Sequence, residues 1–539
     1  MIRLKSLTTA VTTPANECFG YPRHIVLENL PSLSTVILQR AFQYSDDIRV
    51  SNVFSSSYEK RVSICSDNEW LQLDPTITHL TVNSNCLNEL TALSLNRLIA
   101  LKELVIGDNS LNGLSALRLD GLSGLERVVV GSNSFKNSDS NSELVVRGCS
   151  TLRSVTLGSN SFASFGVMEI ERVPLLEELS VGDGCLKNVD VLNLSGLSGL
   201  KRVVIGSSSF SNKNGAFSVV NCTSLESVEI GSSSMGAYSV LSVDNTPSLE
   251  VLAIGSNAFK NVDALRLNGL SKLKKVEISA DSFTNKEGVF ELTNCASVSE
   301  LVVDDNGMKS FKSVEIVGVP SLETIHVGSN AFKNVNALRL VGLPKLKRVE
   351  VGEDSFTNKE GSFELKNCAS VSELVVGNRS MSSFSSFEIS TTPSLKTITI
   401  GSDSFKKVGA FALSGLPALE YLMIGSDSFS QRSGHFVLTS PSVKALVVGD
   451  GSFSQYTDCS IHDVPSLETL SIGDNSFVAS SLELKNLNGL SELTIGRRGF
   501  ENCERVVFES LPELTSIQLG WSALSFKDID NATLTMKSV

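Results

Sequence analysis

The chain has 539 residues, with 46 Lys and Arg against 58 Asp and Glu, which gives a formal net charge of −12 at pH 7. This acidic balance argues against a protein that finds nucleic acid or an anionic membrane through its overall field. Hydrophobic residues make up 41% of the sequence, which supports a packed core and excludes bulk disorder. Aromatic residues reach only 6%, and the abundance of Ser, Asn and Gly indicates repetition rather than several unrelated catalytic domains.

Residues 1–70 fit no regular pattern. Pro31–Leu38 has the same character as Pro320–Val327, which predicts a diverged first coil within an irregular N-terminal region that caps the rest. The start of the chain lacks the apolar core of a secretory signal, and no stretch approaches 18 apolar residues, so we predict no membrane span. We therefore expect a cytoplasmic protein, or a surface or secreted one if the true N-terminus is missing.

Residues 71–539 form a repeat of about 24 residues. Each copy carries alternating apolar positions, a Gly, two further residues, Ser or Ala, and then Phe. In Leu101–Leu111 the apolar residues Leu104 and Ile106 alternate with polar or outward positions, which is the periodicity of a strand. Self-similarity at such a period is typical of a solenoid. The Gly slot falls at residues 107, 131, 158, 182, 206, 231, 255, 328, 352, 377, 401, 425, 449, 473, 496 and 520, with Ser279 and Asp304 between.

The spacing L-x-x-L-x-L-x-x-N-x-L of Leu101–Leu111 resembles that of leucine-rich repeats. The resemblance implies that the Asn slot hydrogen-bonds the backbone along a ladder of coils, and it predicts local breaks at Arg379 and Arg498. The slot otherwise holds mostly Asn or Asp, at Asn85, Asn109, Asn133, Asn160, Asn257, Asn306, Asn330, Asn475, Asp281, Asp354, Asp403 and Asp427.

A second apolar alternation follows in each copy, as at Ala264–Leu267 and Ala337–Leu340. It predicts a second parallel strand on the opposite side of the coil, where many leucine-rich proteins have a helix. The predicted fold is a β-rich solenoid, a right-handed coil of about twenty repeats with two parallel sheets and little helix. Ile495–Cys503 (IGRRGFENC) also resembles the BspA-like subclass of surface proteins.

A longer period of 73 residues overlies the short one. Cys149, Cys222, Cys295 and Cys368 follow it, and Thr284–Gly288 (TNKEG) recurs 73 residues later. Cysteines three coils apart are too distant to form a disulfide, so we expect them to be small buried apolar residues. The remaining cysteines are scattered, and we expect free thiols suited to a reducing compartment.

No catalytic or cofactor motif stands out. The five histidines form no metal-ligand pair, and the sequence has no G-x-S-x-G, G-x-G-x-x-G or phosphate-loop pattern. The glycines follow the coil period, which is explained by bends at strand ends. We therefore predict that the protein is not an enzyme, has no cofactor and no metal, and binds no nucleic acid.

The outward positions of the first strand are the candidate partner-binding surface. Two readings remain open for its charged residues: they anchor an extended partner, or they form cross-strand pairs such as Lys275–Glu300 and Arg348–Glu373 that hold the register. The predicted function is a protein-interaction module or scaffold with an unknown protein partner, and the alternative is a surface or secreted adhesin of BspA-like type. The candidate residues are Arg127, Arg202, Lys275, His326, Arg348, Tyr421, Met423 and Val447. Four N-x-S/T sequons, at Asn193, Asn221, Asn378 and Asn531, matter only outside the cytoplasm.

Overall fold

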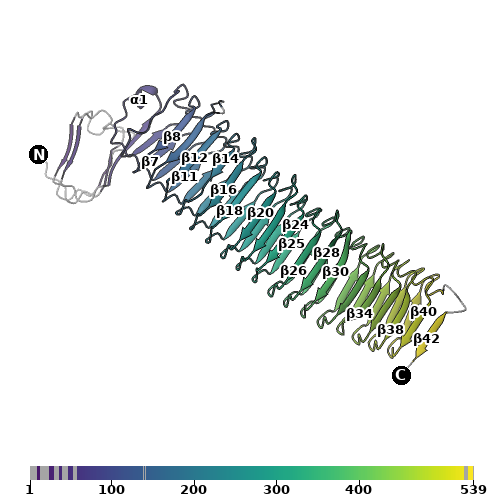
Figure 1. Cartoon of the computed structure of the whole chain (residues 1–539). Helices are drawn as coiled ribbons and strands as arrows, with labels where there is room; N and C mark the ends of the chain where they lie inside the picture. Colours follow the sequence, from purple (N-terminus) through teal and green to yellow (C-terminus); the bar gives the residue numbers. More distant parts are fainter. Residues whose placement is uncertain are drawn as a thin grey trace. The chain divides into compact units, whose positions relative to one another are not determined.

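The computed structural model describes residues 9–11, 24–28, 35–38, 47–51, 57–137, 139, 141–526 and 532–537. They fall into two compact units, residues 1–246 and residues 247–539, each of which is described by itself. The fold is a β-solenoid of about 19 turns of about 24 residues, with parallel strands and almost no helix, as predicted (Figure 1). No helix in the described part of the chain combines the length and apolar character needed to cross a bilayer.

One strand of each coil adds to a parallel sheet, called here the first-strand sheet. In residues 1–246 its successive members are β5 (Ser57–Ile64), β6 (His79–Val82), β7 (Glu103–Ile106), β9 (Arg127–Val130), β11 (Ser154–Leu157), β13 (Glu178–Val181), β15 (Arg202–Ile205) and β17 (Ser227–Ile230). In residues 247–539 they are β19 (Val251–Ile254), β21 (Lys275–Ile278), β23 (Glu300–Val303), β25 (Thr324–Val327), β27 (Arg348–Val351), β29 (Glu373–Val376), β31 (Thr397–Ile400), β33 (Tyr421–Ile424), β35 (Ala445–Val448), β37 (Thr469–Ile472), β39 (Glu492–Ile495) and β41 (Ser516–Leu519).

The second strand of each coil also pairs in parallel, but in short groups. Residues 1–246 contain two three-stranded sheets, β8 (Ala116–Asp120) with β10 (Glu143–Arg147) and β12 (Val167–Glu171), and β14 (Val191–Asn193) with β16 (Ala216–Val220) and β18 (Val240–Asp244). Residues 247–539 contain two more, β20 (Ala264–Asn268) with β22 (Val289–Thr293) and β24 (Ser313–Val317), and β26 (Ala337–Val341) with β28 (Gly361–Lys366) and β30 (Phe384–Ser390). A six-stranded sheet follows, of β32 (Ala410–Ser414), β34 (His435–Thr439), β36 (Asp458–His462), β38 (Ser481–Lys485), β40 (Arg505–Glu509) and β42 (Thr533–Lys537).

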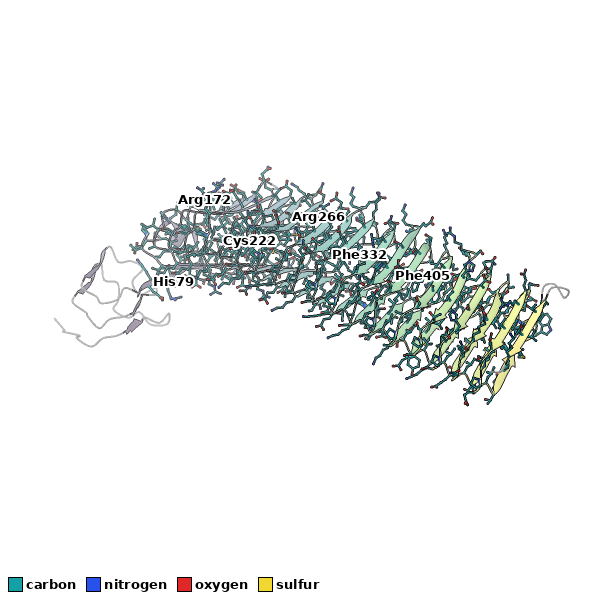
Figure 2. The ribbon with its side chains drawn as sticks, turned by 60° about the horizontal axis from the view of Figure 1, so that its bottom comes forward. His79, Arg172, Cys222, Arg266, Phe332 and Phe405 are labelled. Carbon is teal, nitrogen blue, oxygen red and sulfur yellow. A yellow bond between two sulfur atoms is a disulfide. The ribbon has the colours of Figure 1, made fainter. Side chains whose placement is uncertain are left out.

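The core lies between the two strands of each coil. Leu104 and Ile106 are each 1% exposed, which confirms the predicted alternation. The Phe that ends each repeat phrase is buried, and its rings stack from coil to coil: Phe429, Phe453 and Phe477 have centroid separations of 4.9 and 4.8 Å. These Phe residues have positive φ, 54° at Phe453, a conformation that costs an L-residue about 1–2 kcal/mol. Figure 2 shows Phe332 and Phe405 among the packed side chains.

The side-chain ladder is made by serine, and not by the asparagine that the family resemblance implied. Ser134 donates from Oγ to the Gly107 carbonyl at 2.8 Å and accepts the Ser110 N–H at 3.1 Å. Each serine in this slot is fully buried and donates to the Gly-slot residue of the preceding coil. The set is Ser110, Ser134, Ser161, Ser209, Ser234, Ser282, Ser355, Ser380, Ser404, Ser428, Ser452 and Ser476.

The Asn slot works through its backbone instead. Asn109 has φ 54° and donates its N–H to the Ser132 carbonyl of the next coil at 2.9 Å. The predicted breaks at Arg379 and Arg498 are wrong, because these residues keep φ at 58° and 60° and donate the same bond at 2.7 and 2.9 Å. The slot therefore selects for a left-handed backbone, which Asn and Asp adopt most readily after Gly, and an arginine tolerates it here.

The Gly slot is set by the close approach of neighbouring coils. A Cβ at Gly131 would lie 2.6 Å from the Asp108 backbone nitrogen of the preceding coil, whereas the φ at Gly131 is not positive. The strand-end bend expected from sequence is therefore not the reason for this glycine. Removing the side chain lets two backbone turns stack at contact distance.

The N-terminal part departs from the repeat. Its described elements before β6 are β1 (Thr9–Val11), β2 (His24–Glu28), β3 (Thr35–Leu38), β4 (Asp47–Ser51), β5 and α1 (Asp67–Leu71). Strand β3 lies where the likeness to Pro320–Val327 placed it, and it pairs in parallel with β5. Helix α1 begins with a capping box between Ser66 and Glu69.

Two polar links hold the region around α1 in place. The Lys60 side chain is 3% exposed, and its Nζ lies 2.6 Å from Asp74 Oδ2. Cys65 and Cys86 form a disulfide, so the expectation of free thiols is wrong for this pair. The expectation of burial is confirmed for the four cysteines spaced by 73 residues, Cys149, Cys222, Cys295 and Cys368, which are free and 0% exposed.

Candidate partner-binding surface

The outward face of the first-strand sheet carries the first and third residue of each strand. All eight candidate residues lie on it, on β9, β15, β21, β25, β27, β33 and β35. Because adjacent strands pair in register, the side chains of one column lie one strand spacing apart, about 4.8 Å. The candidates are therefore distributed along the sheet, and only Tyr421, Met423 and Val447 come together as one group.

The five candidates that carry or can carry positive charge each meet a carboxylate. Arg127 Nη1 lies 3.1 Å from Glu103 Oε1, and Arg202 Nη2 lies 3.1 Å from Glu229 Oε1. These contacts favour the register-holding reading for their side chains, because an engaged side chain must give up its partner before it binds another. Pairs at this degree of exposure contribute only about 0–1 kcal/mol each.

The three remaining charged candidates form a second set of such contacts in residues 247–539. Lys275 Nζ lies 3.1 Å from Glu277 and 3.5 Å from Glu300. His326 Nδ1 lies 3.4 Å from Glu350 Oε2. Arg348 lies 3.3 Å from Glu350 and 3.5 Å from Glu373. The predicted pairs Lys275–Glu300 and Arg348–Glu373 are thus present. The Glu277 carboxylate, through a hydrogen bond, raises the pKa of Lys275 above its ordinary value.

Tyr421, Met423 and Val447 differ from the charged candidates. Their exposed fractions are 44%, 41% and 43%, and Met423 lies directly opposite Val447 in the β33–β35 register. The outward positions from β31 to β37 carry no charge at all: Thr397, Thr399, Tyr421, Met423, Ala445, Val447, Thr469 and Ser471. We call this group the neutral patch. Charge depletion with exposed Tyr and Met is typical of the centre of a protein interface.

Charges resume at the rim of the neutral patch. Lys444 Nζ lies 2.8 Å from Glu420 Oε2, one residue before the outward position on β35 and β33. Glu373 precedes the patch on β29 and Glu492 follows it on β39. The hydrogen bond from Lys444 lowers the pKa of Glu420, so this rim pair stays ionised under ordinary conditions. An apolar centre within a charged rim is the arrangement that favours a protein partner.

The described residues show no constellation suited to chemistry. They contain no group of three or more His, Cys, Asp and Glu placed to hold a metal ion. Burial raises the pKa of the thiol of Cys185 to about 11, and burial likewise raises the pKa of Cys459, so neither is an activated nucleophile.

The sequence profile of the BspA type leucine-rich repeat region, as six copies, matches residues 194–313, 303–431 and 361–507, which together span more than half of the chain. Among solved structures, the chain is similar to a leucine-rich repeat protein from Bacteroides ovatus, with 12% identity over 88% of each chain and a TM-score of 0.18. It is also similar to the protein of a TLR13–ssRNA13 complex, with 11% identity over 95% of this chain and 85% of that one and a TM-score of 0.18. No curated protein matches the sequence significantly.

Proposed function

Because the chain belongs to the BspA-type leucine-rich repeat family, we propose that it is a non-enzymatic protein-interaction module that binds its partner through the neutral patch. A protein-interaction role is the general property of such repeat domains. The choice of surface rests on one observation, the uncharged outward face from β31 to β37 with Tyr421, Met423 and Val447 exposed at its centre. The partner that fits is a protein with an uncharged, partly apolar surface.

The test is affinity capture with crosslinking, using the full chain as bait. A variant with Tyr421→Ala, Met423→Glu and Val447→Glu places two charges at the centre of the patch, on outward positions where they cost little stability. A matched control carries Lys275→Glu and Arg348→Glu on the charged part of the same sheet. Circular dichroism and thermal melting establish that both variants fold.

A partner that crosslinks to β31–β37 on the native bait and is lost only from the first variant supports the proposal. Loss from the control variant alone moves the site to the charged strands and revives Lys275 and Arg348 as anchors. Equal retention by all three baits refutes a role for the first-strand face.

A surface or secreted adhesin is the second candidate, and the Cys65–Cys86 disulfide favours it. Disulfides persist in oxidising compartments and are rare in the cytosol, which is the location that the sequence led us to expect. The Asn193 sequon side chain is exposed, so it is open to a glycan in such a compartment. Thiol alkylation of intact cells without reduction, followed by peptide mapping, decides: alkylated Cys65 and Cys86 support the cytoplasm, and a protected pair supports the surface.

A further inference from the structure

The second sheet of residues 1–246 is interrupted between β12 and β14. Strand β12 bonds β10 through its odd-numbered residues: the Val167 N–H donates to the Ser142 carbonyl, and the Glu171 carbonyl accepts from Gly148 at 3.0 Å. Neighbouring residues of a parallel strand direct their backbone groups to opposite sides. Met168 and Ile170 therefore direct their N–H and C=O groups towards β14.

Strand β14 presents the complementary edge. It bonds β16 through the Asp190 carbonyl, which accepts from Ala216 at 2.8 Å, and through the Leu194 N–H, which donates to Ser218 at 2.9 Å. Val191 and Asn193 accordingly direct their backbone groups towards β12. No backbone hydrogen bond joins β12 to β14 in the described part of the chain.

The corner that follows β12 is also unpaired. Gly148 and Gly196, at the equivalent corners of neighbouring coils, donate their N–H groups to the next coil at 3.0 and 2.8 Å. Arg172 occupies this corner with φ 53°, and its N–H donates to no described residue. The guanidinium lies at the outer surface (Figure 2). A continuous set of backbone donors and acceptors thus faces a space that the chain itself does not fill.

That space is a groove of about 510 Å³ between the two strands. Val167 and Val191 on its walls are 44% and 51% exposed. Asp190 and Glu171 are exposed carboxylates, and Asp190 forms no ion pair with any described residue. The third carboxylate, Glu169, is engaged by Arg147.

We propose that this groove binds an extended peptide segment of alternating basic and apolar residues by β-strand addition. The peptide backbone would pair with the free edge at Met168 and Ile170, as extended ligands do at open sheet edges. Its apolar side chains would cover Val167 and Val191, and its cations would lie near Asp190 and Glu171. The groove lies on the second sheet, so this proposal is independent of the neutral patch on the first-strand sheet.

The probe is a fluorescein-labelled Val-Lys-Val-Lys-Val amide, titrated with the full chain and followed by fluorescence anisotropy. A peptide methylated at every internal amide nitrogen has the same charge but cannot donate to a strand edge. It should bind at least about tenfold more weakly, since two to three backbone hydrogen bonds are lost. The Glu171→Gln, Asp190→Asn double variant should bind the unmethylated peptide about fivefold more weakly.

The matched control is Glu315→Gln on β24, whose exposed carboxylate lies on another strand of the second sheet and which should leave the affinity unchanged. A benzophenone at the central valine of the peptide should crosslink to residues 166–196. Equal binding of the methylated peptide, crosslinks confined to other residues, or no binding at 1 mM peptide (a concentration on the order of the weakest specific interactions) each overturns the proposal.

Discussion

Replacing Ser428 with Ala tests how the buried serine ladder stabilises the solenoid. The Ser428 hydroxyl donates to the Gly401 carbonyl at 2.9 Å and accepts the Ser404 N–H at 3.2 Å. If both backbone groups were left unpaired in the core, each would cost about 1–3 kcal/mol. The structure shows a lower-cost route where Ala331 follows Gly307: the Gly307 N–H donates to the Asp304 carbonyl of its own coil at 2.9 Å.

The same local bond would pair Ser404 N–H with the Gly401 carbonyl, so that the two groups released by Ser428→Ala satisfy each other. We therefore expect a loss of about 1 kcal/mol in the free energy of unfolding, the value of one hydrogen bond. Ser428→Val should cost about 1–3 kcal/mol more, because it overfills a fully buried site. Hydrogen exchange across residues 397–432 and urea unfolding measure both, with the exposed Ser414→Ala as control. A loss above about 3 kcal/mol for Ser428→Ala refutes the exchange of partners, and a loss equal to that of the control refutes the ladder's contribution.

Three further predictions concern other parts of the chain. Phe453→Ala should lower the free energy of unfolding by about 3–5 kcal/mol, because it removes a ring stacked at 4.9 and 4.8 Å on its neighbours, and denaturant melts monitored by hydrogen exchange should show the loss concentrated in adjacent coils. Reducing the Cys65–Cys86 disulfide, which closes a separation of 21 residues, should destabilise its surroundings by about 2–4 kcal/mol, and a melting curve unchanged by reductant would contradict this. Burial alone would raise the pKa of Asp74, but hydrogen bonds, first from Lys60, lower it below the ordinary 3.8, so its contribution to stability is complete above that pH and is lost as the pH falls through the lower folded value. The Asp74→Asn variant should lack this part of the acid dependence in a pH series of melting temperatures.

The coil and its core could be predicted from sequence because their signals are local and repeated. The alternation at Leu104 and Ile106 fixes which face is buried, and the 24-residue spacing stacks equivalent positions. The neutral patch was visible in part for the same reason, since Tyr421, Met423 and Val447 fall on outward positions of a known register.

The serine ladder, the disulfide and the gap beside β12 depend on contacts between coils, which single-residue periodicity does not encode. Ser134 bonds a carbonyl 27 residues earlier, and its slot also accepts Ala or Cys, so its sequence signal is only that of a small residue. Cys65 lies before the regular repeat and Cys86 takes the serine slot of the first regular coil, so no spacing rule joins them.

The 73-residue period is a property of the second sheet. The first-strand sheet pairs coil by coil within each unit, whereas the second sheet breaks after β12, β24 and β30, each the third strand of its group. The middle coil of each three-coil group is longer: its Gly-slot spacing is 158 − 131 = 27 in the first and 377 − 352 = 25 in the fourth, and β28 shows a register shift at Gly361. The coil from Gly425 to Gly449 has the ordinary 24, and there the second sheet continues for six strands. The lengthened middle coil therefore accompanies each of these breaks, and the groove at β12 follows from a repeat that matches its neighbours on one side of the coil but not on the other.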